Sequence, residues 1–246
     1  MVRLLLPLPA SAPREARVEG ERFHYLARVL RLSPGDALEV FDGAGRSFAA
    51  RVESMGENRA TLSLGPPVES SLRPRRDITL VQGLPKADKL EWVLQKGTEL
   101  GAAAFAPVET ARSVVKLGAE RAGPRQKRWA RIVEEAARQC GRSDVPAVHP
   151  ARPLLEAVRA LPHGTRLLVL DEEERQTRLS AAYAALEEAA PLALLVGPEG
   201  GLERGEVEAL RALSATPVTL GRRVLRTETA SVAALAVLLH LEGELG

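Results

Sequence analysis

The sequence predicts two domains: a small strand-rich module over residues 1–70, followed by an α/β domain over residues 71–246 with a mostly parallel sheet. Three observations support this prediction. The stretch GPPVESSLRPRRD, residues 65–77, interrupts the apolar pattern with three prolines and three arginines, as an interdomain linker does. Before this break, apolar and polar residues alternate with a period of two. After it, apolar runs alternate with amphipathic segments, which favours parallel strands covered on both faces.

In the first domain, HYLARVLRL (24–32) has the spacing of a helix and ends at a turn, SPGD. The segment ALEVFDGAGRSFAARVESM (37–55) alternates on both sides of DGAG, which predicts a β-hairpin. NRATLSL (58–64) predicts a further strand. These elements describe a compact, strand-rich module.

In the second domain, strands and helices are expected in alternation. Strands are predicted over residues 77–84, 103–110, 166–173, 192–199 and 217–223. Helices are predicted over residues 86–100 and 125–140, the second closed by Gly141. Ligands in open parallel sheets bind beyond the carboxyl ends of the strands, so the turns after the strands are the place to search for a site.

Composition limits the classes of protein that the chain can belong to. Hydrophobic residues make up 45% and charged residues 27%, as in globular proteins, and no apolar run reaches the 18 or so residues of a membrane span. The N-terminus lacks the apolar region of a signal peptide, so a cytoplasmic protein is expected. A single cysteine, Cys140, excludes an intrachain disulfide, and four scattered histidines argue against a metal site.

Charge is distributed unevenly between the two parts of the chain. Residues 1–76 hold 12 arginines and 9 acidic residues, a net charge of +3, while residues 77–246 hold 22 basic and 23 acidic residues, a net charge of −1. Of all basic residues, 29 are arginine and 5 lysine. Arginine suits bidentate phosphate contacts, so a polyanionic partner is indicated, although genome composition or growth temperature also explains a high arginine content.

The stretch LLVGPEGGLERGEVEAL (194–210) has the outline of a phosphate-binding loop, with a strand, a glycine-rich turn and a helix. It lacks the GxxxxGK string of a P-loop, and a GxGxxG fingerprint is also absent from the chain. A glutamate in the turn, Glu199, would repel a phosphate. The turn therefore suits a ligand without phosphates, gripped by backbone groups, or else it is a plain connection between a strand and a helix.

A second segment, VTLGRRVLRTETASVAALAVLLHL (218–241), passes from a strand through GRRVLR into a helix. Thr227 is the expected N-cap, and Glu228 falls in the first turn, where it complements the helix dipole. The helix is apolar nearly all round, which predicts burial at the centre of the fold or against a second subunit.

These two segments, VGPEGGLERGEVE and LGRRVLRTETA, resemble the SPOUT superfamily of knotted methyltransferases, and within it the RsmE-type 16S ribosomal RNA (uracil-N3)-methyltransferases. The resemblance extends to KADKLEWVLQKGTELGAAAFAPVETARSVVK (86–116) and AARQCGRSDVPAV (136–148). HYLARVLRLSPGDALEVFDGAG looks like the PUA-like RNA-binding barrel of that family. The resemblance thus covers nearly the whole chain and implies an enzyme, which we expect to be a homodimer through the apolar C-terminal helix.

The resemblance implies that S-adenosylmethionine binds in a trefoil knot formed by the turns after the last three strands. Carried onto this chain, the implied cofactor-binding residues are Leu170, Gly197, Pro198, Glu199, Gly200, Gly201, Leu220, Gly221, Val224, Leu225 and Thr229. The catalytic candidates are Arg226, which would stabilise a developing uracil anion, with Arg223 and Glu228. Arg223 also fits a phosphate or solvent contact, and Glu228 also fits a capping role alone.

The family methylates N3 of one uridine, uridine 1498, in the 16S RNA of the small ribosomal subunit. The expected phosphate contacts are Arg28, Arg31, Arg46, Arg73, Arg75, Arg76, Arg112 and Arg142. With aromatic residues at 3%, base stacking should be minor. Two alternatives stay open: a SPOUT enzyme acting on another RNA such as transfer RNA, and a noncatalytic RNA-binding or ribosome-assembly factor.

Overall fold

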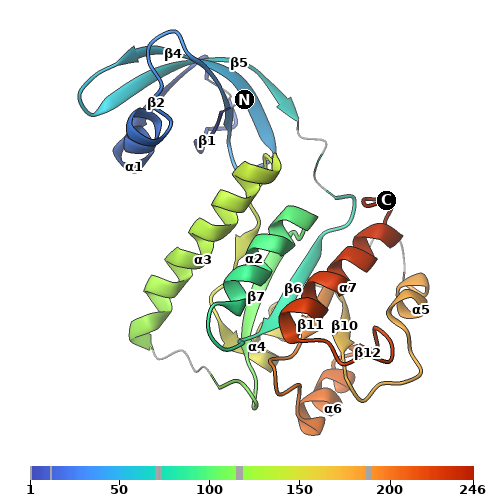
Figure 1. Cartoon of the computed structure of the whole chain (residues 1–246). Coiled ribbons are helices and arrows are strands. Elements are labelled where there is room, and N and C mark those ends of the chain that lie inside the picture. Colours follow the sequence, from blue (N-terminus) through green and yellow to red (C-terminus); the bar gives the residue numbers. More distant parts are fainter. Residues whose placement is uncertain (1, 12, 70–71, 73, 115–118, 187–189) are drawn as a thin grey trace. The chain divides into compact units, whose positions relative to one another are not determined.

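The chain forms two compact units in the computed structural model, which describes residues 2–11, 13–69, 72, 74–114, 119–186 and 190–246 (Figure 1). The N-terminal unit comprises Met1–Arg73 and Ala137–Val145, and the C-terminal unit comprises Pro74–Ala136 and Pro146–Gly246. The segment Ala137–Val145 therefore groups with the N-terminal unit, although the sequence suggested a single boundary near residue 70.

The N-terminal unit is built on a five-stranded sheet. Its strands are β1 (Arg3–Leu5), β2 (Glu15–Glu19), β3 (Ala37–Phe41), β4 (Arg46–Met55) and β5 (Arg59–Glu69), in the order β1-β3-β4-β5-β2. The β1–β3 pair is parallel and the others are antiparallel. Val18, Val40 and Leu62, at 0% exposure, belong to its core. The predicted hairpin is confirmed by β3 and β4, whose turn places Gly43 and Gly45 at positive φ.

Two predictions for this unit are wrong in their bounds. The helix expected over residues 24–32 is instead α1 (Gly20–His24) followed by a π-helical turn, η1 (Tyr25–Val29), and the chain leaves it through Arg31 at φ 53°. The strand expected to end at residue 64 continues to Glu69, through part of the expected linker. Pro67, which has no N–H, lies opposite Phe48, where the β4–β5 register shifts and tolerates the missing donor.

The C-terminal unit holds a seven-stranded sheet. Its strands are β6 (Ile78–Gly83), β7 (Ala104–Glu109), β8 (Ala147–Val148), β9 (Arg152–Pro153), β10 (Arg166–Leu170), β11 (Leu192–Val196) and β12 (Thr216–Val218). The order is β12-β10-β11-β6-β7-β8, and β9 also pairs with β7. Every pair in it is parallel, which confirms the predicted mostly parallel sheet. The two-residue strands β8 and β9 were not predicted, since they are too short to show a period.

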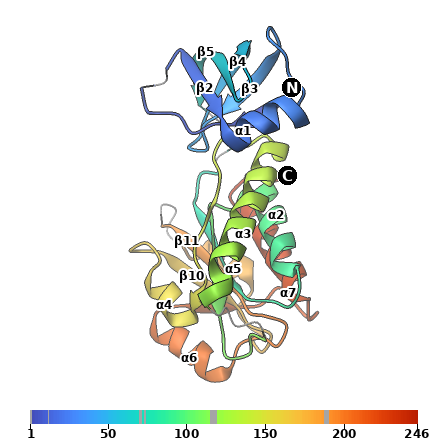
Figure 2. The same ribbon diagram turned by 90° about the vertical axis from the view of Figure 1, so that its left-hand side faces the viewer.

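Six helices accompany this sheet: α2 (Lys89–Leu100), α3 (Ala119–Cys140), α4 (Leu154–Arg159), α5 (Leu179–Ala184), α6 (Arg204–Ala212) and α7 (Thr227–Leu241). α4 and α6 join one core cluster with Val81, Val169 and Leu195. Gln82, whose side chain points to the other face, bonds to α7, so α7 covers that face beside α2 (Figures 1 and 2). Across the described residues, no helix is both long enough and apolar enough to span a bilayer.

Two predictions concern helix α7: burial at the centre of the fold or against a second subunit, and Thr227 as its N-cap. It is buried along one face, at residues such as Ser231, Leu235 and Leu238, while Val237 and Leu241 are each 38% exposed. Within one chain the helix is therefore not buried on all sides. Thr227 is its first helical residue and Arg226 occupies the N-cap, because the Thr227 hydroxyl is committed to a carbonyl oxygen elsewhere.

Candidate functional site

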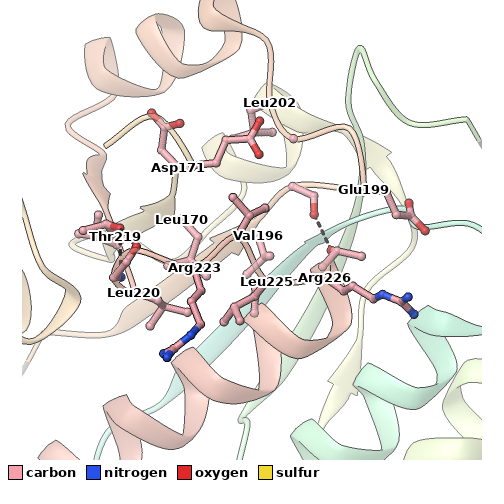
Figure 3. Close-up of a pocket in the computed structure, with 18 of the residues that line it drawn as sticks. Leu170, Asp171, Val196, Glu199, Leu202, Thr219, Leu220, Arg223, Leu225 and Arg226 are labelled. Carbon is pink, nitrogen blue, oxygen red and sulfur yellow. Dashed lines mark hydrogen bonds between the residues drawn. The ribbon is translucent and has the colours of Figure 1, made fainter. Parts of the chain in front are cut away.

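A cavity of about 310 Å³ opens at the carboxyl ends of β10, β11 and β12, where the parallel sheet predicts a ligand site. Figure 3 shows apolar side chains such as Leu170, Val196 and Leu225 at its centre, with the charged groups of Glu199, Arg223 and Arg226 toward its periphery. Its lining consists of Leu170, Asp171, Glu172, Arg175, Val196, Gly197, Pro198, Glu199, Gly201, Leu202, Val218, Thr219, Leu220, Gly221, Arg223, Val224, Leu225, Arg226, Thr227 and Ala230.

The turn after β11, residues 197–201, is tight because its glycines allow close approach of the backbone. The Pro198 carbonyl oxygen accepts from the Gly201 N–H at 2.9 Å, and Gly201 adopts φ 71°. Gly83 at the end of β6 faces this turn, since a Cβ there would lie 2.6 Å from Pro198 Cδ and 2.7 Å from Pro198 N. A glycine on β6 is thus part of the turn's construction.

The segments that follow β10 and β12 are hydrogen-bonded to each other. The Asp171 N–H donates to the Val218 carbonyl oxygen at 3.1 Å, the Thr219 N–H to Thr177 at 2.9 Å, and the Leu179 N–H to Thr219 at 3.0 Å. Asp171 also accepts from the Arg204 guanidinium at 2.7 Å, which connects β10 to the start of α6. The cavity wall is therefore a cross-linked set of turns, held mainly by the backbone.

Beneath the glycine turn lies a fully buried polar network. The Gln82 amide donates to Thr227 Oγ1 at 3.0 Å, and the Thr227 hydroxyl donates to the Gly197 carbonyl oxygen at 2.6 Å. The Ser231 hydroxyl shares its one proton between Gln82 Oε1 and the Thr227 carbonyl oxygen, which both lie within hydrogen-bond distance. Polar groups in such a network fix one arrangement, so β6, β11 and α7 are held in register at the cavity floor.

Glu199, the acidic residue of the glycine turn, is paired with lysine groups of the chain. Its carboxylate accepts from the Lys86 N–H at 3.1 Å and lies 2.9 Å from Lys89 Nζ. Burial by itself would raise the pKa of Glu199, but these hydrogen bonds and the Lys89 charge lower that pKa below its ordinary value. The hydrogen bond to Glu199 raises the pKa of Lys89. Both groups are therefore charged at neutral pH.

The comparison with known proteins agrees with this geometry. Residues 72–239 match the RNA methyltransferase domain family, and residues 18–65 match the RNA methyltransferase PUA domain. Ribosomal RNA small subunit methyltransferase E of Bacillus subtilis is 34% identical over 245 residues, covering 97% of this chain and 96% of the relative. The chain belongs to this family of RNA methyltransferases. The predicted family resemblance is thereby confirmed.

Two further relatives support the assignment. The methyltransferase E of Mycobacterium bovis is 37% identical over 229 residues, covering 89% of this chain and 84% of the relative. The crystal structure of the Neisseria gonorrhoeae methyltransferase E, bound to S-adenosyl methionine, superposes with a TM-score of 0.87 at 30% identity and covers 98% of each chain. The similarity thus extends over both units of this RNA methyltransferase family member.

Most of the residues predicted for the cofactor lie on the wall of the cavity, and their role there stays a prediction. Gly200 and Thr229 lie outside the lining, as does the catalytic candidate Glu228, whereas Arg223 and Arg226 belong to it. Sequence reasoning missed Asp171, Glu172, Arg175, Val196, Leu202, Val218, Thr219, Thr227 and Ala230. Val196 and Val218 end their strands, so the strand prediction itself contained a signal for them.

The arginines predicted to contact phosphate divide into buried and exposed groups. Arg76 is paired with Glu242 at 2.8 Å, and Arg142 with Asp144 at 2.6 Å, and both are buried. Arg46 is paired with Asp42 at 2.7 Å and also donates to the carbonyl oxygens of residues 9 and 10. These three side chains make structural contacts within the chain, and their contact with RNA stays a prediction.

Four of the predicted arginines are exposed: Arg28, Arg31, Arg75 and Arg112. Arg112 donates to the Gly200 carbonyl oxygen at 2.8 Å and so touches the turn beside the cavity. Arg73 lies outside the described residues. Among the residues that the structure describes, no group of three or more metal-ligating side chains comes together.

Proposed function

We propose that this chain uses S-adenosylmethionine to methylate N3 of one uridine, uridine 1498, in the 16S RNA of the small ribosomal subunit. The observation that carries the proposal is the cavity at the carboxyl ends of β10, β11 and β12, in a chain of the RNA methyltransferase family. Its apolar centre, backbone-lined turns and charged groups of both signs suit a zwitterion that carries an adenine and no phosphate.

The residues of the cavity fit this cofactor. Leu170, Val196, Leu220 and Leu225 offer an apolar slot for the adenine, and the turns at 197–201 and 218–221 offer backbone hydrogen-bonding groups at its edge. S-adenosylmethionine supplies an electrophilic methyl group when bound. We infer that the interlocked turns after β10, β11 and β12 form the trefoil knot of the SPOUT fold, and that the five-stranded sheet of the N-terminal unit is its PUA-like barrel.

Arg226 is the residue proposed to act on the uracil. N3 of uridine carries an imide proton that must leave as the methyl arrives, so negative charge develops on the ring. Arg226 and Arg223 both line the cavity, are exposed, and bring guanidinium groups to its edge. A fixed positive charge there stabilises the uracil anion in the transition state, and the cavity orients the nucleophile in line with the methyl group.

The RNA would be held chiefly by charge, because aromatic residues make up only 3% of the chain. The target uridine would have to turn out of its stack to meet the cofactor. We also propose a homodimer in the cytoplasm. The exposed apolar side chains Trp92 on α2 and Val237 and Leu241 on α7 support a second subunit there, since the two helices lie side by side.

The test uses small ribosomal subunits from a strain that lacks this gene, incubated with the purified protein and methyl-labelled S-adenosylmethionine. The RNA is digested and the labelled nucleoside identified by mass spectrometry. N3-methyluridine at one site in 16S RNA is the expected product. Label in transfer RNA or on another atom would show that the proposed substrate is wrong. If no label is found and the cofactor does not bind, the protein would be a noncatalytic RNA-binding factor.

A further inference from the structure

Lys89 lies where three parts of the C-terminal unit meet. As the first residue of α2, it places Nζ 2.9 Å from Oε1 of Glu199 and 3.4 Å from Oε2 of Glu228. Glu199 belongs to the turn that lines the cavity, and Glu228 is the second residue of α7. One ammonium group therefore connects the start of two helices to the glycine turn.

The two carboxylates depend on this ammonium group. Both lie within salt-bridge distance of one nitrogen atom, so they are close enough to repel each other if the positive charge is removed. The Lys86 N–H contributes a further bond to Glu199, whereas among the described residues Lys89 is the cation paired with Glu228. Loss of Lys89 would thus push the glycine turn away from the first turn of α7, which follows directly after Arg226.

We propose that Lys89 is a positioning residue of the methyltransferase, which holds the turn at Glu199 against the start of α7 and so shapes the cofactor site. The inference rests on the proposed function, because it takes the cavity as the place where S-adenosylmethionine binds. Lys89 acts through Glu199 and Glu228, and it does not itself line the cavity. Glu199 is accordingly the residue through which Lys89 holds the glycine turn in place.

The partial exposure of the three side chains indicates that Lys89 positions the turn without contributing much to the stability of the fold. The side chains of Lys89, Glu199 and Glu228 are 30%, 27% and 17% exposed. Ion pairs in such positions contribute little to the free energy of unfolding, since the groups are well hydrated in the unfolded chain too. Removing Lys89 should therefore change cofactor affinity much more than thermal stability.

The same helix provides a matched control. Lys96 pairs with Glu99 at 3.0 Å, with side-chain exposures of 35% and 28%, and neither residue lines the cavity. Lys89→Met and Lys96→Met each remove one partly exposed ammonium group from α2, the first from ion pairs with Glu199 and Glu228 and the second from its pair with Glu99. Their effects on folding should be alike, and their effects on the turn should differ.

The experiment measures the dissociation constant for S-adenosylmethionine by calorimetry, with the melting temperature of each variant. Lys89→Met should raise the dissociation constant by about tenfold, as expected when a positioning contact is lost, and Lys96→Met should leave it unchanged. Lys89→Arg should restore most of the affinity. Wild-type affinity in Lys89→Met, or an equal loss in Lys96→Met, would overturn the proposal. Absence of binding by the wild-type protein would instead refute the proposed function.

A second pair of variants keeps the test decisive if Lys89→Met does not fold. Glu199→Gln removes the charge that Lys89 neutralises on the turn, and Lys89→Met combined with Glu199→Gln removes both partners. Because Lys89 also pairs with Glu228, the double variant should bind S-adenosylmethionine more weakly than Glu199→Gln, but by much less than tenfold. A further loss of tenfold or more in the double variant would show that Lys89 acts independently of Glu199 and would contradict the proposal.

Discussion

The hydroxyl of Thr227 donates a 2.6 Å hydrogen bond to the carbonyl oxygen of Gly197, which joins the first residue of α7 to the turn after β11. Oγ1 of Thr227 also accepts a hydrogen bond from the Gln82 amide. All of these groups are buried, so neither partner can turn to water when the other is lost. A single hydroxyl thus couples the stability of the C-terminal unit to the shape of the cavity.

Replacing Thr227 by valine tests this coupling. Valine has nearly the same shape but leaves the Gly197 carbonyl oxygen without this donor, which should lower the free energy of unfolding by about 1–3 kcal/mol. The affinity for S-adenosylmethionine should fall as well. Urea denaturation and calorimetry measure the two effects. Thr227→Ser keeps the hydroxyl and should retain the affinity, so a serine variant as weak as the valine variant would contradict the argument.

A methyl group at Gly83, on β6, should disrupt the turn after β11. The new Cβ would lie 2.6 Å from Pro198 Cδ, 2.7 Å from Pro198 N and 2.9 Å from Gly197 C, and the proline ring and the two backbone atoms have little freedom to yield. Gly83→Ala should therefore destabilise the protein by about 1–3 kcal/mol or more and abolish cofactor binding. Thermal unfolding and calorimetry would detect both losses.

Gly205→Ala is the matched control for that prediction. Gly205 lies in α6, where an added Cβ has no heavy atom within 4 Å and the backbone is helical. Alanine should stabilise the helix by about 0.5–1 kcal/mol and leave cofactor binding intact. Equal behaviour of the two variants would mean that the contact at Gly83 is not what shapes the turn.

The sequence predicted the parallel sheet and the position of the site because these features have local signals. Apolar runs identified the strands β6, β7, β10 and β11, and parallel connectivity places their carboxyl ends at one edge. The glycine turn could be recognised because it follows a strand and precedes a helix but matches neither the P-loop nor the GxGxxG pattern. The bounds of α1 and β5 were missed, because a π-helical turn and a strand continuing through Gly65, Pro66 and Pro67 contradict local propensity.

The contacts that shape the site were not predictable in the same way. Gln82 looks like one polar residue within an apolar strand, and only its bonds to Thr227 and Ser231 reveal a network. Thr227 was predicted to cap α7 because local capping is the commonest use of such a residue, but a carbonyl oxygen 30 residues earlier in the chain takes its hydroxyl. Arg76 and Arg142 were predicted to contact phosphate because arginine is usually exposed, whereas both are buried and paired with Glu242 and Asp144.

Arg226→Ala should separate catalysis from cofactor binding. Arg226 lines the cavity and is exposed, so its loss should leave the fold intact. Removing a group that stabilises the developing anion should lower kcat by about 100-fold or more. Arg222→Ala is the control, because Arg222 is exposed in the same loop but does not line the cavity. The experiment measures methyl transfer to the small subunit and cofactor affinity for each variant. Near-normal turnover by Arg226→Ala would refute the assigned role.

Asp42 should make the stability of the N-terminal unit depend on acid pH. Its buried carboxylate accepts from the N–H groups of Ala44 and Arg46 and from Arg46 Nε at 2.7 Å. Burial alone would raise the pKa of Asp42, but the bonds from Arg46 and Ala44 lower that pKa below its ordinary value of 3.8. A lowered pKa in the folded state means that the stabilisation is complete above 3.8 and is lost as the pH falls through the folded-state pKa.

Asp42→Asn should therefore lower the melting temperature at pH 7, because the amide has no charge and directs a donor toward Arg46. The difference from the wild type should shrink below pH 3.8, where the wild-type carboxyl group itself becomes protonated. Asp36→Asn is the control, since Asp36 is exposed and its carboxylate accepts a hydrogen bond from the Ser33 N–H. Thermal unfolding followed by circular dichroism between pH 7 and strongly acidic pH gives the comparison. A difference that stays constant across this range would mean that the charge of Asp42 does not stabilise the turn.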